Sequence, residues 1–376
     1  MSSSSLALRL KQIRESLGMK LTDAADKLGF SSYQILSNIE EGKREVKASE
    51  LLKFSSVYYC SIDKLLGYEK PLADVAFVWR NPPKERRAEI EKDILSRCER
   101  YRLLESLLNL KPMDRFINVT IDDINTNYKV QKLASEVSGL LKLGRRPAFT
   151  LQKVLEQDYG IKVLYYALSE GSSVSTINHY LGNVVVINNN EAPWRQNFDL
   201  AHELFHLITW DAVVLGQNHI NEGYSEDIEK KADAFASALL LPGDEVSKEI
   251  MARAETSKHI TYSDMVDIAI EFGVSTQALV YRLFYLNFIR SFVQADAIAK
   301  DFDLLQISNK KRIGEWKERE SEQFTSLSIR CLRKGLISRG KFAEFMEIND
   351  RSDIDDYITS RGFIEEEGNS IEIMAS

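Results

Sequence analysis

Two histidines and a glutamate stand close together in the segment His202-Glu203-Leu204-Phe205-His206. On an α-helix, residues four positions apart project from the same face, so both imidazoles can bind one cation. Glu203 is rotated by about 100° from His202, which brings its carboxylate beside a metal-bound water. Neutral imidazoles leave the metal charge largely uncompensated, so the water is acidified and Glu203 can pass its proton to a leaving amine. The segment therefore predicts metal-dependent peptide hydrolysis.

The residues around this segment predict a buried helix over residues 194–210. Its apolar positions are Phe198, Leu200, Ala201, Leu204, Phe205, Leu207 and Ile208. Aliphatic side chains would pack better in such a helix than two imidazoles and a carboxylate. One histidine would be compatible with an ordinary core position, whereas two histidines and the acid favour a metal site.

A catalytic metal site also needs a third protein ligand and an open position for water. The helix predicted over 226–241 carries Glu229 on an otherwise apolar face, as a ligand would be placed. Asp233, one turn later, can accept a hydrogen bond from a ligating imidazole. Glu226 on the same helix is the competing ligand, and the helix dipole alone also favours a glutamate in a first turn. We predict Glu229 as the ligand.

The substrate and the oxyanion would require further groups near the metal. A strand is predicted over residues 183–187, just before the metal-binding helix. If this strand is an exposed edge, an extended peptide could pair with it across the metal. His179, His219 and Tyr224 are the candidates for stabilising the oxyanion, and the sequence does not separate them.

The N-terminal part of the chain predicts a small all-α domain over residues 6–68. Its first helix carries Leu6, Leu10, Ile13 and Leu17 at helical spacing and ends at a glycine. Thr22 is expected to cap the second helix and Ser31 or Ser32 the third, and two more helices are expected over 48–58 and 62–66.

The rest of the chain divides into three regions. Residues 69–124 are expected to form a linker, over 71–83, and a basic amphipathic helix, over 85–110. The apolar stripe of that helix comprises Ile90, Ile94, Cys98, Tyr101 and Leu108. We interpret the stripe as packing against a neighbouring domain or a second subunit rather than as a nucleic-acid contact. Residues 125–290 mix helical and strand patterns, and residues 291–376 predict a helical region with an acidic tail.

Composition and charge indicate a globular protein of two or three domains. The chain has 376 residues, 44% hydrophobic and 28% charged, and a formal net charge of −7. Residues 1–70 contain 11 Lys and Arg against 9 Asp and Glu, a local balance of +2. DNA binding by this domain is therefore expected to be weak or assisted by homodimer formation, rather than driven by a large positive charge.

The cysteines and apolar runs indicate the compartment. Cys60, Cys98 and Cys331 are widely spaced and form no CxxC pair, which argues against a disulfide framework. The N-terminus shows no secretory signal, and the longest apolar runs, 184–187 and 238–241, are too short to span a bilayer. We expect a cytoplasmic protein without a membrane partner.

The metal-site motifs resemble those of the ImmA/IrrE metallopeptidase family. The run WRQNFDLAHELFHL begins at Trp194, and EKKADAFA and LLLP begin at Glu229 and Leu239. The likeness covers about residues 125–290, and two separated motifs agree in order and distance. Phe205 replaces a common glycine, and Asp233 replaces a common asparagine.

This resemblance implies an α+β zincin-like metallopeptidase domain. The family's metal ligands correspond to His202, His206 and Glu229, and its general base corresponds to Glu203. Zn²⁺ is the expected metal, with Mn²⁺ as the alternative.

Residues 6–68 resemble the XRE/Cro-type helix-turn-helix domain. The likeness includes the pairs at 24–25 and 28–29, the run IEEGKR at 39–44 and the closing IDKLLG at 62–67. The third helix would enter the major groove. The side chains expected at base edges are Ser32, Tyr33, Gln34, Ser37 and Asn38, and those expected at phosphates are Lys43 and Arg44. Thr22 replaces a usual phosphate-contacting glutamine, and a protein-docking or dimerisation module is the alternative.

Three functions are compatible with these features. The first is a DNA-binding transcriptional regulator with a zinc-dependent endopeptidase site that cleaves a repressor or antitoxin-type protein, as part of a stress or phage response. The second is a DNA-binding regulator with a structural or silent metal site. The third is a toxin-antitoxin or phage-defence component acting through protein contacts. The expected partners are double-stranded DNA, bound through residues 6–68, and the protein substrate.

Overall fold

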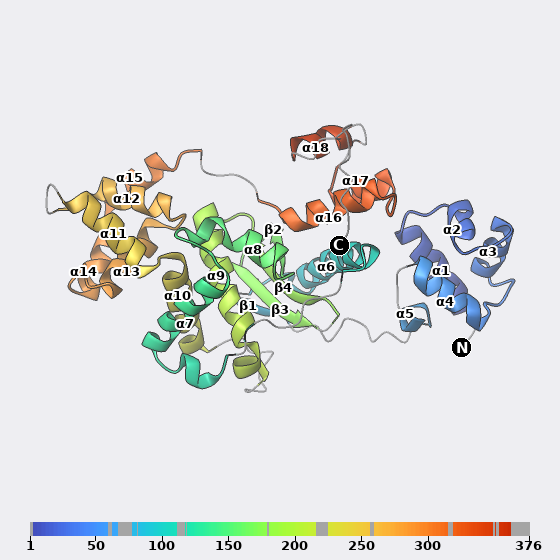
Figure 1. Cartoon of the computed structure of the whole chain (residues 1–376), viewed down its shortest axis with the longest axis horizontal. Helices are drawn as coiled ribbons and strands as arrows, with labels where there is room; N and C mark the ends of the chain where they lie inside the picture. Colours follow the sequence, from blue (N-terminus) through green and yellow to red (C-terminus); the bar gives the residue numbers. More distant parts are fainter. Residues whose placement is uncertain are drawn as a thin grey trace, which may run out of the picture. The chain divides into compact units, whose positions relative to one another are not determined.

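The computed structural model shows a multidomain chain with a helical N-terminal domain and an α+β domain (Figure 1). It describes residues 3–58, 62–66, 77–80, 82–110, 117, 119–178, 180–215, 225–255, 259–314, 319–348, 350 and 353–361. Two compact units divide the chain: one draws on 1–73, 100–111 and 324–376, and the other on 74–99 and 112–323. These units cut the chain differently from the four regions above, whose boundaries stay a prediction.

The first unit contains the helix-turn-helix domain. Its helices are α1 (Ser3–Ser16), α2 (Leu21–Lys27), α3 (Tyr33–Glu40), α4 (Ala48–Val57) and α5 (Ile62–Leu66). Their apolar faces meet in a core that includes Leu10, Leu36 and Phe54. The same unit includes α17 (Arg339–Phe345), α18 (Ile354–Ser360) and most of α16 (Glu322–Arg333).

The structure tests the expected N-cap residues of two helices in this domain. Ser32 is the N-cap of α3, and its hydroxyl accepts a hydrogen bond from the Gln34 amide at 3.2 Å. The expectation that Thr22 caps α2 is wrong, because that helix begins at Leu21 and its N-cap residue is Lys20. Thr22 lies inside the first turn, where its hydroxyl donates to Asp23.

The long helix α6 (Arg87–Leu107) carries the predicted apolar stripe. Ile94, Cys98 and Tyr101 of that stripe are buried. Within the first unit, the ring of Tyr101 packs against Phe324 at a centroid distance of 5.5 Å. The stripe therefore has a packing role inside the described chain.

The second unit contains a four-stranded sheet in the order β1-β3-β4-β2. Its strands are β1 (Val78–Arg80), β2 (Lys162–Tyr166), β3 (Ser173–Asn178) and β4 (Gly182–Asn188). β3 pairs antiparallel with both β1 and β4, and β2 pairs parallel with β4. β4 is therefore an interior strand, which overturns the hypothesis that residues 183–187 form an exposed edge.

Two of these strands are not expected from the sequence. The composition of residues 71–83 indicates a linker, but Val78–Arg80 form β1. The glycine and serines of residues 171–173 indicate a turn, but Ser173 begins β3. β1 is only three residues long and β3 is rich in serine and threonine, so neither shows the long apolar alternation that marks a strand.

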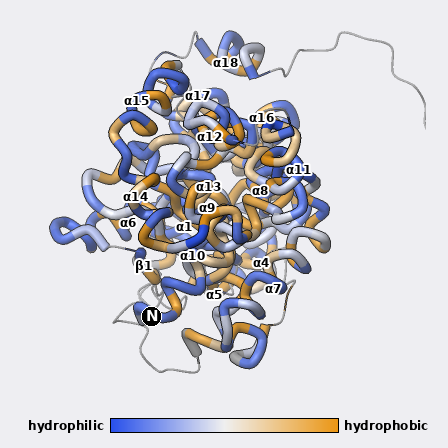
Figure 2. The backbone as a smooth tube through the Cα atoms, turned by 90° about the vertical axis from the view of Figure 1, so that its left-hand side faces the viewer, coloured by the Kyte–Doolittle hydropathy of each residue, from blue (hydrophilic) through white to orange (hydrophobic). Residues whose placement is uncertain are grey.

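Helices make up the rest of the second unit (Figure 1). Besides the first part of α6, they are η2 (Ile121–Ile124), α7 (Asn127–Leu140), η3 (Pro147–Phe149), α8 (Leu151–Gln157), α9 (Pro193–Trp210), η4 (Asp211–Leu215), α10 (Glu226–Leu240), α11 (Gly243–Ala254), α12 (Tyr262–Glu271), α13 (Thr276–Tyr285), α14 (Phe292–Ala299) and α15 (Phe302–Lys311). The helices carry both hydrophobic and hydrophilic residues (Figure 2). α9 contacts β3, β4 and α10, and its residues from Leu200 to Trp210 are all buried.

Both ends of α10 are fixed by side chains. The hydroxyl of Ser225 accepts a hydrogen bond from the Ile228 amide at 3.4 Å. At the other end, Arg282 of α13 donates from Nε to the Leu241 carbonyl at 3.0 Å and from Nη1 to Gln131 at 2.9 Å. The contacts of Ser225 and of Arg282 Nε satisfy backbone groups that a helix leaves unpaired at its ends. In the described part of the chain, none of the helices combines the length and hydrophobicity needed to cross a bilayer.

The carboxyl group of Glu156 is buried at the end of α8 and is 1% exposed. The Ser321 hydroxyl donates to its Oε1, and the Gln152 amide donates to its Oε2 at 3.3 Å. Burial nevertheless dominates and raises the pKa of Glu156 to about 7.

Glu156 should make stability depend on pH between about 4.5 and 7. The folded state holds this proton more tightly than the unfolded state, so the stabilisation is complete below the unfolded pKa and is lost as the pH rises through about 7. The free energy of unfolding should therefore fall between pH 5 and 8, and Glu156→Gln should make this fall smaller by on the order of 2–3 kcal/mol. Urea unfolding at both pH values measures this, with exposed Glu136→Gln as the control. An unchanged pH dependence would contradict it.

Candidate metal centre

Two helices bring the predicted ligands together. His202 and His206 lie one turn apart on α9, and their Nε2 atoms are 3.0 Å apart. Glu229 of α10 places Oε2 at 3.3 Å from His202 Nε2 and Oε1 at 3.3 Å from His206 Nε2. Atoms with these separations can all lie at the bond length of about 2.0–2.1 Å that zinc forms with imidazole and carboxylate ligands. The donor set therefore fits one small divalent cation.

The carboxylate of Glu203 supports this fit. It is fully buried, and its Oε1 accepts a hydrogen bond from the Ser173 hydroxyl of β3 at 2.6 Å. Its other oxygen, Oε2, has no hydrogen-bond partner among the described residues. A buried carboxylate oxygen left without a partner is costly. A water held by a metal at the adjacent imidazoles would satisfy it, which is the arrangement expected of a general base.

Asp233 lies where an imidazole-orienting acceptor is expected. Its Oδ1 is 2.9 Å from His202 Nδ1. An acceptor at Nδ1 keeps the proton there and leaves the Nε2 lone pair free for a metal. The competing ligand Glu226 instead pairs with Lys230 at 2.6 Å and is 83% exposed. Of the two glutamates, Glu229 is the one that reaches the imidazoles.

Arg80 of β1 is a part of this centre that sequence reasoning missed. Its Nη1 donates to Asp199 Oδ1 at 2.7 Å, and its Nη2 donates to Asp233 Oδ1 at 2.9 Å. Its Nε lies 3.8 Å from Glu229 Oε2. Arg80 follows the apolar triplet FVW, which is the only signal in its vicinity, and more than a hundred residues separate it from these acids.

Burial and hydrogen bonding set the charges of the centre. Burial lowers the pKa of His206, which favours the neutral imidazole that a metal binds. Burial acts in the same direction on His202, but hydrogen bonds to Asp233 and Glu229 outweigh it and raise the pKa. Burial would raise the pKa of Glu229, yet hydrogen bonds from both imidazoles hold it well below its usual range. Glu229 is therefore a charged carboxylate at neutral pH.

Asp199, the buried acid paired with Arg80, has a raised pKa. Burial raises the pKa of Asp199 to about 7, although Arg195 and Arg80 both lower it. Its side chain is fully buried. The carboxylate form of Asp199 thus depends on the guanidinium groups beside it.

A cavity of about 530 Å³ opens next to these residues. Arg80 and Asp233 form its wall on the side of the centre, and aromatic side chains form much of the rest. The aromatic lining residues are Trp194, Phe198, Tyr281, Tyr285 and Phe292. A space of this size and character can hold a large side chain of a peptide.

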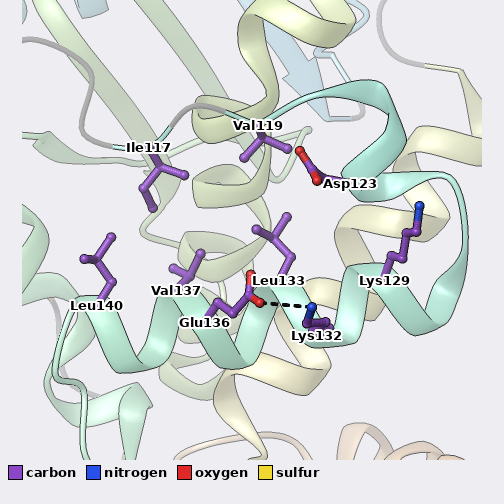
Figure 3. Close-up of a pocket in the computed structure, with 9 residues that line it drawn as sticks. All are labelled: Ile117, Val119, Asp123, Lys129, Lys132, Leu133, Glu136, Val137 and Leu140. Atoms are coloured by element: carbon purple, nitrogen blue, oxygen red, sulfur yellow. Dashed lines mark ion pairs between the residues drawn. The ribbon is translucent and has the colours of Figure 1, made fainter.

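A second cavity, of about 470 Å³, lies along α7 (Figure 3). Leu133, Val137 and Leu140 line it together with Ile117 and Val119. Lys132 and Glu136 form an ion pair on its rim at 3.5 Å (Figure 3). None of the predicted metal-site residues lines this cavity, so it plays no part in the centre.

The remaining site predictions fall into two groups. The oxyanion candidates His179, His219 and Tyr224 lie outside the described residues. The expected DNA contacts lie on α3 and the turn after it. Tyr33, Gln34 and Asn38 are exposed, whereas Ser32 and Ser37 are partly buried. The hydroxyl of Ser37 donates to Glu41 at 3.0 Å.

The two predicted phosphate contacts are already paired with acids. Lys43 lies 2.5 Å from Glu41. Arg44 donates to both oxygens of Glu50, at 2.7 and 3.1 Å. Either cation would have to share or exchange its partner to meet a phosphate.

Comparison with known proteins agrees with the fold. Residues 156–284 match the family described as IrrE N-terminal-like domain, and residues 10–65 match the helix-turn-helix family. The chain is a helix-turn-helix domain fused to an IrrE-type domain. The IrrE-type domain is metallopeptidase-like, and the matched residues include α9 and α10, which carry the predicted ligands.

One curated relative matches a short stretch of the chain. The chain is 39% identical over 66 residues to the HTH-type transcriptional regulator ImmR of Bacillus subtilis (strain 168). The match covers 18% of this chain and 51% of the relative, so the chain spans about half the length of the protein it matches.

Asp233 should support metal binding without being a ligand. Asp233→Ala removes the acceptor at His202 Nδ1, so the affinity for zinc should fall by about 10–100-fold. Asp233→Asn should lose less, because its amide oxygen can still accept that bond. Competition with a chromogenic chelator measures the affinity. Asp227→Ala, an exposed acid of the same helix that pairs with Lys231, is the matched control. Equal affinity in all variants would rule out this role.

Proposed function

We propose that the chain is a DNA-binding regulator with a metal-dependent endopeptidase site that cleaves a repressor or antitoxin-type protein. The observation that supports this best is the meeting of His202, His206 and Glu229 beside the buried carboxylate of Glu203. The family matches supply the regulator class and the peptidase-like domain. The substrate class follows from the resemblance to ImmA/IrrE proteins.

In the proposed mechanism, His202, His206 and Glu229 would hold the metal, with Zn²⁺ favoured and Mn²⁺ as the alternative. The bound metal supplies Lewis acidity and makes water more acidic. Glu203 is placed to accept the proton of the attacking water and to return it to the leaving amine. The Ser173 hydroxyl holds Glu203 Oε1 and so directs the unpaired Oε2. Asp233 holds the His202 ring.

A second function, a regulator whose metal site is structural or silent, is supported by a different observation. His202 and Glu203 are fully buried, and His206 is 1% exposed. Closed, buried metal sites are typical of structural roles, whereas catalytic sites keep an open position. The two functions differ in whether the chain cleaves a protein.

Glu203→Gln should separate these functions. The amide keeps the shape of the side chain but cannot take a proton, so proteolysis should fall by about a hundredfold or more while bound metal is retained. Purified chain is incubated with proteins encoded beside its gene, cleavage is followed by intact-mass spectrometry, and metal is measured by elemental analysis. His206→Ala, which removes a ligand, should lose both metal and cleavage. Absence of cleavage by the metal-loaded native chain would favour the silent site.

The DNA role predicts two distinguishable substitutions. Gln34→Ala should weaken binding to the cognate operator while leaving non-specific binding unchanged, because Gln34 would contact base edges. Lys43→Ala should weaken binding to all sequences and reduce the salt dependence by about one ion, because Lys43 would contact a phosphate. Fluorescence anisotropy at several salt concentrations measures both. If the native chain has no measurable affinity for DNA at low salt, a module acting through protein contacts is the better interpretation.

A further inference from the structure

The strand β1 covers one edge of the sheet beside the metal centre. Arg80 pairs with Ser173, and Val78 pairs with Ser175, both on β3. Ser173 also donates its hydroxyl to Glu203. β1 is therefore the neighbour of the strand that contacts Glu203, the residue placed as the general base.

Without β1, β3 would present an unpaired edge at this position, since β4 occupies its other side. Unpaired edges accept an extended peptide by backbone hydrogen bonding. A peptide added to β3 would pass Ser173 and hence Glu203. β1 occupies the place where such a peptide would bind, and it comes from a segment that precedes the region resembling the peptidase family.

The side chain of Arg80 lies where a side chain of such a bound peptide would lie. It reaches past the sheet edge to Asp199 and Asp233 and comes within 3.8 Å of Glu229. Asp199 is fully buried and its ionised form needs a cation close by. The contacts thus define a subsite for a guanidinium or ammonium group next to the proposed metal ligands.

The side chains of β1 are largely buried, but its backbone pairs with only part of β3. Val78 packs against Trp210 and Ile177. The indole of Trp79 donates to Glu91 Oε1 at 2.7 Å. β1 pairs with Ser173–Ser175 only, which is half of the six-residue strand β3, so a longer extended peptide would form more backbone hydrogen bonds with this edge.

We propose that the β3 edge is the peptide-binding strand of the metal centre and that β1 occupies it in the resting chain. The substrate is then an extended segment with an arginine or lysine in the position of Arg80, and it binds by displacing β1. This inference rests on the proposed function for the meaning of "substrate", but peptide binding can be tested without cleavage.

The test uses the full chain carrying Glu203→Gln and a labelled peptide with the sequence of residues 74–83. Adding Arg80→Ala weakens the chain's own β1, so the peptide should bind that variant at least about tenfold more tightly than the chain with intact β1. A peptide with alanine in place of its arginine should bind about tenfold more weakly. Arg145→Ala, an exposed arginine elsewhere in the same unit, should change nothing.

Trp79→Ala, which removes the bond to Glu91, provides a second way to loosen β1 and should act in the same direction. If both variants keep their metal and their melting temperature but bind no peptide, β1 is a fixed strand and the inference is wrong. Loss of metal or of cooperative unfolding in both variants would also contradict the inference, because β1 would then be an essential part of the folded domain.

Cleavage distinguishes this inference from the proposed function. With Glu203 intact, Arg80→Ala should cleave a protein substrate faster than the native chain. Equal or slower cleavage by Arg80→Ala would contradict the proposal that β1 occupies the β3 edge, but it would not contradict the proposed peptidase function. Tight peptide binding without cleavage by any metal-loaded variant would contradict the proposed peptidase function and would support peptide binding at the β3 edge.

Discussion

The centre depends on one constraint, which is that the polar side chains of the buried helix α9 must each find a partner. Burial of an unpaired polar group costs more than a hydrogen bond returns, and three of these residues take a partner from another element. Asp199 uses Arg80 of β1, Glu203 uses Ser173 of β3, and His202 uses Asp233 of α10. The polar face of α9 thereby determines which elements lie around it.

The helix-turn-helix domain also contains a buried polar side chain that is paired with a group from another helix. Its core is apolar, but Arg14 of α1 is buried and donates to both oxygens of Glu40 at the end of α3, at 2.6 and 2.8 Å. Hydrogen bonding to Glu40 raises the pKa of Arg14, despite the opposing effect of burial. This pair ties the expected reading helix to α1, so its exposed side chains are presented from a fixed support.

The sequence predicted the parts of the centre that lie within single helices. The spacing of His202 and His206 and the place of Glu229 in an apolar face require only helical periodicity, and the structure brings these residues together. The helix-turn-helix and α+β classes were confirmed by the fold and the family matches.

The errors concern strand pairing and contacts made over long sequence distances. β1 is too short to show alternation, and the interior position of β4 depends on β3, whose first residue belongs to a segment with the composition of a turn. Arg80 could not be connected with Asp199 or Asp233, because no local pattern reports a contact across so many residues. Thr22 was misplaced relative to the true cap, a small difference that capping preferences alone do not resolve.

Helix α10 supplies two groups of different kind from consecutive turns. Glu229 faces both imidazoles, and Asp233 holds the ring of His202 from behind. The helix is held at one end by Ser225 and at the other by Arg282. Any sliding or tilting of α10 as a rigid rod would withdraw the coordinating oxygen and the ring support in the same movement. A rigid displacement of α10 would therefore leave the two imidazoles on α9 without the third ligand and without the acceptor at His202 Nδ1.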